Sequence, residues 1–97
     1  MTTPKDFSHL DLNGRAFIQA RMFGADLTQA DLRTANLFQA NLTGADLRSA
    51  QLLDADLSGA QLAGANLTHA NLTGADLTGA NLTDVIMPEG WKLVRDE

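Results

Sequence analysis

The chain of 97 residues contains no cysteine and no tyrosine, and aromatic residues make up only 5% of it. The lack of cysteine excludes a disulfide-stabilised scaffold and a zinc site with thiolate ligands. No run approaches the roughly 18 apolar residues of a membrane-spanning helix. The N-terminal sequence also lacks the apolar stretch of a secretory signal. We therefore expect a cytoplasmic protein that does not associate with a membrane.

Positive charge is scarce as well. Seven Lys and Arg residues stand against twelve Asp and Glu residues, which gives a net charge of -5. An acidic chain without a basic cluster is poorly suited to the phosphate backbone of nucleic acid, so we expect no direct nucleic-acid binding. Disorder is also disfavoured, because 44% of the residues are hydrophobic and they recur at regular positions.

Alanine and leucine dominate the chain in a strict five-residue repeat. Ala occupies every fifth position from Ala20 to Ala80, and Leu every fifth position from Leu27 to Leu82. Looser repeats extend the frame over residues 5–89. A period of five forms no apolar stripe on an α-helix and no single apolar face on a strand. The backbone must therefore bend once per repeat and coil around an axis that the Ala and Leu side chains face.

Units such as ADLTQ at 25–29 and ADLTG at 75–79, in unbroken tandem, resemble the pentapeptide repeat family. The resemblance implies an all-β fold, a right-handed quadrilateral β-helix of about four coils with four pentapeptides each. Residues 20 apart would then stack. The Leu side chains would fill the axis, the Asp and Asn side chains would bond nearby backbone, and Gly would occupy turns that need unusual dihedral angles.

The repeat weakens at both ends, which divides the chain into three segments. We expect an N-terminal leader and degenerate first coil over 1–19, a regular β-helix over 20–84, and a C-terminal cap and tail over 85–97. Arg15 stands at an Ala position, so we expect the first coil to distort until its charge reaches water; contact with an anion is the alternative. The C-terminal cap is expected to be a lid over the last coil, and the alternative is a docking segment; its apolar residues are Trp91, Leu93 and Val94.

The sequence offers no set of residues for catalysis or metal binding. His9 and His69 fall in one stack but three coils apart, about 14 Å at the spacing of paired strands. Metal ligands lie near 2 Å from the ion, so these residues cannot share one. The repeats from Ala20 to Asp84 contain no insertion that could form a cleft. We therefore expect no enzymatic activity, no catalytic residue, no metal and no cofactor.

Several apolar residues are candidates for protein contacts. Ile18 and Phe38 lie 20 residues apart in an outward position, and Phe23 follows at the next corner. The other candidates are near the ends of the chain: Phe7, Phe17 and Trp91. We expect a weak dimer joined end to end through the N-terminal coil near Phe7 and Phe17, with Ile18 and Phe38 at its margin. Another repeat protein is the alternative partner.

These observations favour a non-catalytic structural or protein-interaction module. The alternative comes from the resemblance, because some pentapeptide repeat proteins mimic duplex DNA and bind DNA gyrase. No Lys or Arg occurs between residues 49 and 84, and the acids of that segment would form the face of such a decoy for gyrase or another DNA-binding protein: Asp54, Asp56, Asp76 and Asp84. Size opposes this alternative, since four coils match only about six base pairs.

Overall fold

The backbone of each repeat makes the same sharp bend. The computed structural model describes residues 5–91. In a typical repeat the N–H of Ala30 donates to the carbonyl of Leu27 at 3.1 Å. The residue just before the Ala position has a positive φ, as at Gly44 with +68°. A bond across four residues with a positive φ at the third defines a type II β-turn, so the chain turns a corner every five residues.

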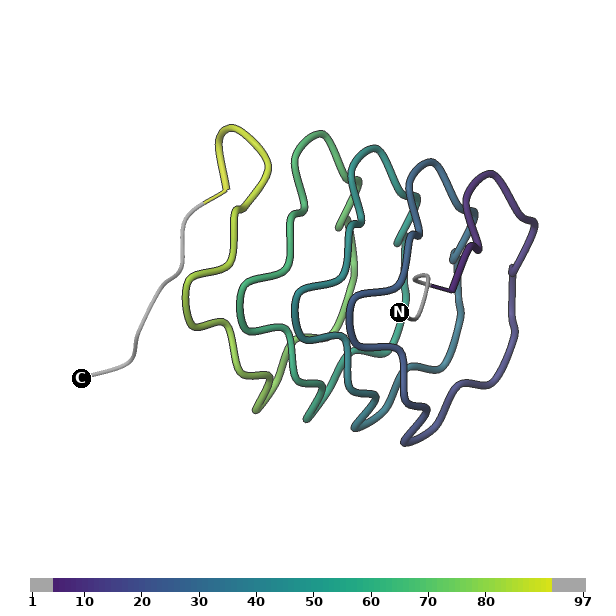
Figure 1. Ribbon diagram of the computed structural model, residues 1–97, viewed down its shortest axis with the longest axis horizontal. Coiled ribbons are helices and arrows are strands. Elements are labelled where there is room, and N and C mark those ends of the chain that lie inside the picture. The colour runs from purple at the N-terminus through teal and green to yellow at the C-terminus, as the bar shows by residue number, and fades with distance from the viewer. Residues whose placement is uncertain (1–4, 92–97) are drawn as a thin grey trace.

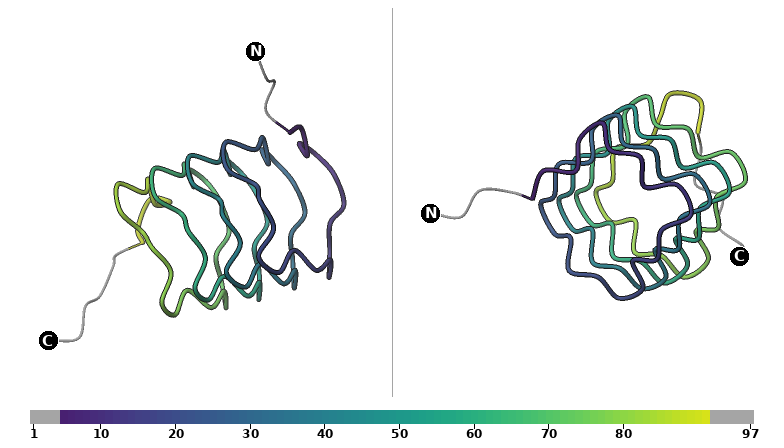
Figure 2. Two further views of the ribbon diagram at one scale, coloured as in Figure 1. Left: turned by 60° about the horizontal axis from the view of Figure 1, so that its bottom comes forward. Right: turned by 90° about the vertical axis from the view of Figure 1, so that its right-hand side faces the viewer.

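Four corners complete one coil. Parallel bridges join the second residue of a repeat to the residue 20 positions later, as from Asp26 to Asp46. Two backbone bonds flank the Asp46 position, from the Leu27 N–H to the Asp46 carbonyl at 2.8 Å and from the Asp46 N–H to the Ala25 carbonyl at 2.9 Å. Each bridge is a single residue, so residues 5–91 contain no helix and no longer strand. The result is a β-helix whose coils stack with a four-cornered outline (Figures 1 and 2).

The bridges align the repeats into four walls, which we number in chain order. Wall 1 comprises residues 5–9, 25–29, 45–49, 65–69 and 85–89. Wall 2 comprises residues 10–14, 30–34, 50–54 and 70–74. Wall 3 comprises residues 15–19, 35–39, 55–59 and 75–79. Wall 4 comprises residues 20–24, 40–44, 60–64 and 80–84. The last two residues of each five form the corner that follows the wall, and coils 1 to 4 begin at residues 5, 25, 45 and 65.

The interior consists of the Ala and Leu columns, as the sequence predicts. Every Ala-position and Leu-position residue from Ala25 to Leu72 is buried. The side chains of the remaining wall and corner residues point outward, and no polar side chain of residues 5–91 is buried. The core is therefore a continuous apolar column along the axis of the rod.

The first coil keeps this geometry although its sequence departs from the repeat. Phe7 and Phe17 take Leu positions and their half-buried rings meet edge to face, with centroids 6.4 Å apart. Arg15 is exposed at the open end, where its charge stays in water, but the expected distortion of the first coil is not observed, since its backbone keeps the regular bonds to coil 2. The Lys5 Nζ donates to the Arg21 carbonyl at 3.2 Å, on the outer edge of the same coil. The boundary at 19/20 is therefore a change of sequence rather than of backbone structure.

The C-terminal end differs from the expected lid. The coil continues to a bridge between Asn66 and Ile86, and Pro88 is buried. Trp91 remains 42% exposed, and its backbone N–H donates to the Pro88 carbonyl rather than to the preceding coil. Closure within the described residues therefore comes from 85–88, where Val85 and Met87 also pack on the core. Leu93 and Val94 lie outside the described residues.

No helix long and apolar enough to cross a membrane occurs between residues 5 and 91.

Candidate interaction surface

Polar side chains at the second repeat position serve the backbone. The Thr28 N–H donates to the Asp26 Oδ1 at 3.0 Å, and the Thr28 hydroxyl donates to the same oxygen at 2.7 Å. The same backbone bond from the residue two positions later recurs at every Asp and Asn in this position from 6 to 81. These side chains stabilise the approach to each turn. Their regularity therefore has a structural cause and does not indicate a catalytic or metal site.

Two surface arginines form ion pairs within their own chain. Arg33 pairs with Asp31 and Arg48 pairs with Asp46, each at 2.7 Å. The hydrogen bond from each guanidinium lowers the pKa of the carboxyl that accepts it. Arg15 and Arg21 make no such pair with any carboxylate of residues 5–91.

A shallow groove runs along the corner that follows wall 1. Its volume is about 460 Å³ and six residues line it: His9, Thr28, Gln29, Arg48, Ser49 and His69. The two imidazoles belong to coils 1 and 4, about 14 Å apart at the spacing of paired strands. No group of three His, Asp or Glu residues among 5–91 is placed to hold a metal ion. The groove thus brings no catalytic or metal-binding set together.

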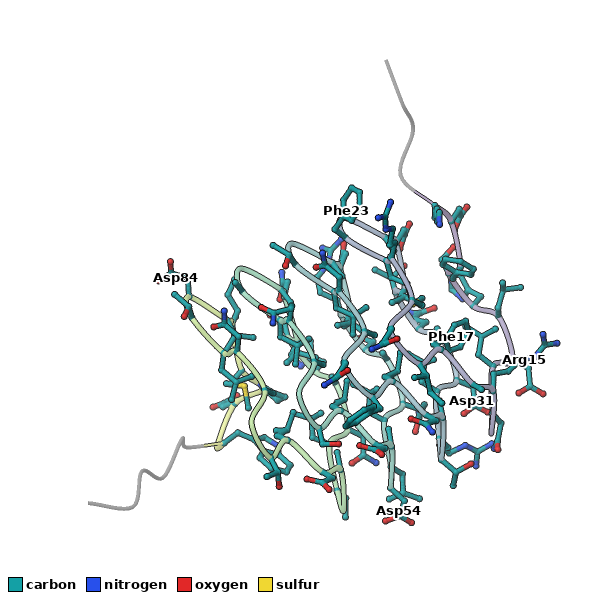
Figure 3. All side chains as sticks on the ribbon, turned by 90° about the horizontal axis from the view of Figure 1, so that it is seen from below. Arg15, Phe17, Phe23, Asp31, Asp54 and Asp84 are labelled. Atoms are coloured by element: carbon teal, nitrogen blue, oxygen red, sulfur yellow. The ribbon has the colours of Figure 1, made fainter. Side chains whose placement is uncertain are left out.

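The exposed apolar residues lie in separate places. Ile18 and Phe38 are 53% and 39% exposed, and they occupy the same corner of wall 3 in successive coils. Phe23 is 64% exposed but lies one wall further on, at the corner of wall 4. Phe17 packs against Phe7 at the N-terminal end. Figure 3 labels Phe17 and Phe23, which lie apart. Of the six predicted contact residues, the structure therefore groups only Ile18 and Phe38 on one outer surface.

Wall 3 is uncharged in the coil that contains Phe38 and charged in the coils on either side. Its second coil, residues 35–39, contains no charged residue. Arg15 begins the wall in coil 1, and the same column reaches Ala55 in coil 3. Ala55 is flanked along the chain by Asp54 and Asp56. The 20-residue stacking is the signal in the sequence that relates these charges to one another.

The predicted acidic face is divided between two sides of the rod. Asp54 lies at the corner between walls 2 and 3, and Asp56 and Asp76 lie on wall 3. Asp84 lies at the corner between walls 4 and 1, which is diagonally opposite Asp54 (Figure 3). The expectation of one face with four acids is therefore wrong, because 84 and 54 differ by one and a half coils.

The comparisons with known proteins agree with this architecture. The family model for pentapeptide repeats matches eight copies, over residues 6–39, 17–52 and 50–87. A search of curated proteins gives no significant match. Among solved structures, the pentapeptide repeat protein Rfr23 of the cyanobacterium Cyanothece 51142 is 30% identical, with a TM-score of 0.63. The match covers 84% of this chain and 60% of that one, so the chain spans about three fifths of Rfr23's length.

Two further structures are similar. The pentapeptide repeat protein alr5209 of Nostoc PCC 7120 is 41% identical over 92% of this chain and 78% of that one, with a TM-score of 0.47. QnrB1, a plasmid-mediated fluoroquinolone resistance protein, is 21% identical over 79% of this chain and 57% of that one, with a TM-score of 0.46. The repeat match extends over most of the β-helix, and the chain belongs to the pentapeptide repeat family.

Proposed function

We propose that this protein is a non-catalytic structural and interaction module that binds other proteins through wall 3. The observation that carries the proposal is the exposure of Ile18 and Phe38 beside each other on a wall whose second coil is uncharged. Apolar groups that protrude from a surface low in charge are typical anchors of protein interfaces. The partner would be a protein, either a second copy of the chain or another repeat protein.

The rigidity of the rod supports this function. Its coils are joined by backbone bonds of 2.6–3.0 Å along every wall. Because such a surface is already ordered, binding a partner costs little conformational entropy. A flat, preformed wall therefore suits recognition of another rigid surface.

Affinity capture with matched variants tests the proposal. The immobilised wild-type protein would be compared with Phe38→Glu and with Thr83→Glu, which places the same charge on the corner of wall 4. We expect partners retained by the wild type and by Thr83→Glu to be lost with Phe38→Glu. Equal retention by all three proteins would show that wall 3 is not the binding surface.

The acidic decoy remains the second candidate, supported by the absence of Lys and Arg between residues 49 and 84. The separation of Asp84 from the acids near wall 3 weakens it. The likeness to QnrB1 is too distant to support it. In a gyrase supercoiling assay at low salt we expect no inhibition at micromolar concentration. Inhibition that weakens in an Asp54→Asn, Asp76→Asn double variant would favour the decoy instead.

A further inference from the structure

We propose that wall 3 is self-complementary and binds wall 3 of a second copy, with the two rods antiparallel. This inference rests on the proposed function and names the partner. It differs from the expected end-to-end dimer, since Phe7 and Phe17 are packed against each other within the first coil, whereas Ile18 and Phe38 are outside.

The stacking of the coils sets the geometry of such a dimer. We place a two-fold axis between the two walls, at the level of coil 2 and perpendicular to both rods. This axis reverses the order of the coils and leaves each column facing the same column of the second copy. Phe38 then meets Phe38 of the second copy. Ile18, one coil earlier, meets Ser58, one coil later. The corner at Ser58 and Gly59 is small, so it leaves room for the Ile18 side chain.

The same operation brings the cation of coil 1 next to the acids around coil 3 of wall 3. Arg15 and Ala55 share a column and lie equally far from coil 2, on opposite sides. The Arg15 side chain is exposed at the open end of coil 1, so the operation places it next to the segment of the other copy in which Asp54 and Asp56 flank the buried Ala55. Arg15 has no carboxylate partner within its own chain among residues 5–91. The two-fold axis creates this contact twice, so each copy supplies the cation of one contact and the acids of the other.

The arrangement is closed. Each copy uses the same surface, so a two-fold contact satisfies both and does not lead to growth. The ion pairs are at the margin of the contact, where they set orientation and respond to salt. The rings of the two Phe38 residues lie at its centre, where burial contributes most.

Sedimentation equilibrium over a range of concentration and salt tests the dimer with matched variants. We expect Phe38→Glu to weaken association by roughly tenfold or more, about 1.4 kcal/mol. Phe23→Glu introduces the same change one wall away and should leave association unaltered. Higher salt should weaken the wild-type dimer. A wild-type monomer at about 1 mM, or equal weakening by both variants, would overturn the proposal.

A mixing experiment tests the orientation independently of Phe38. Arg15→Glu places like charges opposite each other in its homodimer, and Asp54→Lys weakens its own homodimer through repulsion of Arg15. In the mixed dimer, Glu at 15 of one chain faces Lys at 54 of the other, while the remaining native contact is kept. We expect the mixture to associate more tightly than either variant alone, with melting curves confirming that both are folded. No gain on mixing would exclude the antiparallel register.

The two proposals can fail separately. If the wild type is monomeric but Phe38→Glu still abolishes capture of a different protein, wall 3 binds partners without binding itself. If dimerisation is lost with Phe7→Glu in a variant that remains folded, and not with Phe38→Glu, the end-to-end dimer is correct and the wall 3 dimer is wrong.

Discussion

The fifth residue of each repeat has a left-handed backbone whatever its side chain. The seven glycines in this position have φ from +67° to +74°, as expected of turn glycines. Nine other residues adopt the same region, among them Thr34 with φ of +57°, where a β-branched side chain is strongly disfavoured. The Thr34 N–H bonds to the Leu53 carbonyl of the next coil at 2.9 Å. Stacking between coils therefore imposes the turn on residues that would not form it alone.

Exchanging residues at these corners should change stability in opposite directions. We expect Thr34→Gly to raise the free energy of unfolding, because glycine relieves the strain at positive φ. Gly44→Ala should lower it by about 1 kcal/mol. No atom lies within 4 Å of the added methyl group at Gly44, so the cost there comes from the backbone alone. Urea denaturation measures both free energies of unfolding. If Gly44→Ala left this free energy unchanged, the turn would not require a left-handed residue.

Stability should fall in acid through the carboxyls of the turns. Bonds from Arg48 and Arg33 lower the pKa of Asp46 and Asp31 respectively. A carboxyl whose pKa is lower in the folded chain stabilises the fold fully at pH values above its pKa in the unfolded chain, which is about 3.9 for Asp. This stabilisation is lost as the pH falls through the pKa of the folded chain. We therefore expect the melting temperature to fall below about pH 4.

The Asp46→Asn variant is the control for this acid effect. Asn66 accepts the same backbone bond as Asp46, from the Thr68 N–H at 3.0 Å, so an amide is compatible with the turn. The variant lacks the titrating group, so its melting temperature should fall less between about pH 5 and pH 2 than that of the wild type. An identical pH profile would remove Asp46 from the explanation.

At the scale of one coil, the sequence predicts the inward columns correctly because the five-residue period and the need to bury Ala and Leu leave one solution. It predicts the ends less well. The first coil is regular despite Lys5 and Arg15 at Ala positions, since its backbone bonds to coil 2 and its open side leaves these charges in water. The exposure of Trp91 was also not predictable, because no repeat pattern fixes a residue beyond Pro88. The grouping of Ile18 with Phe38 followed from the period.

Truncation of Leu residues should report their position along the coils. Leu57 is fully buried in coil 3, whereas Leu82 near the C-terminal end is half-buried. We expect Leu57→Ala to cost about 2–5 kcal/mol and Leu82→Ala clearly less. Leu57→Asp would bury an unpaired carboxylate and should abolish cooperative unfolding. Calorimetry measures these effects, and equal costs for the two Ala variants would contradict the inward packing of the middle coils.

Across the whole molecule, backbone bonding decreases toward both ends, and in coil 1 the N–H groups of Asp11, Ala16 and Arg21 have no backbone acceptor among residues 5–91. The Leu57 N–H donates to the Asp76 carbonyl at 2.8 Å. The N–H groups of Leu77, Leu82 and Met87 have no backbone acceptor among residues 5–91. We expect amide hydrogen exchange to be slowest in coils 2 and 3 and fastest for these N–H groups at the two ends. Uniform protection along the rod would indicate that it opens only as a whole.

The pairing of each residue with the one 20 positions later separates the information for the core from that for the surface. Inserting one whole repeat after Gly24 would leave every inward column of Ala and Leu unbroken, yet it would turn all later residues by a quarter of a coil. Phe38 would then occupy the corner that follows wall 4, above Phe23 instead of Ile18. Insertion of 20 residues would instead lengthen the rod and keep each later residue on its wall. Gain or loss of single repeats can therefore create new binding surfaces in a lineage while the fold is maintained, and gain of four at a time preserves the existing ones.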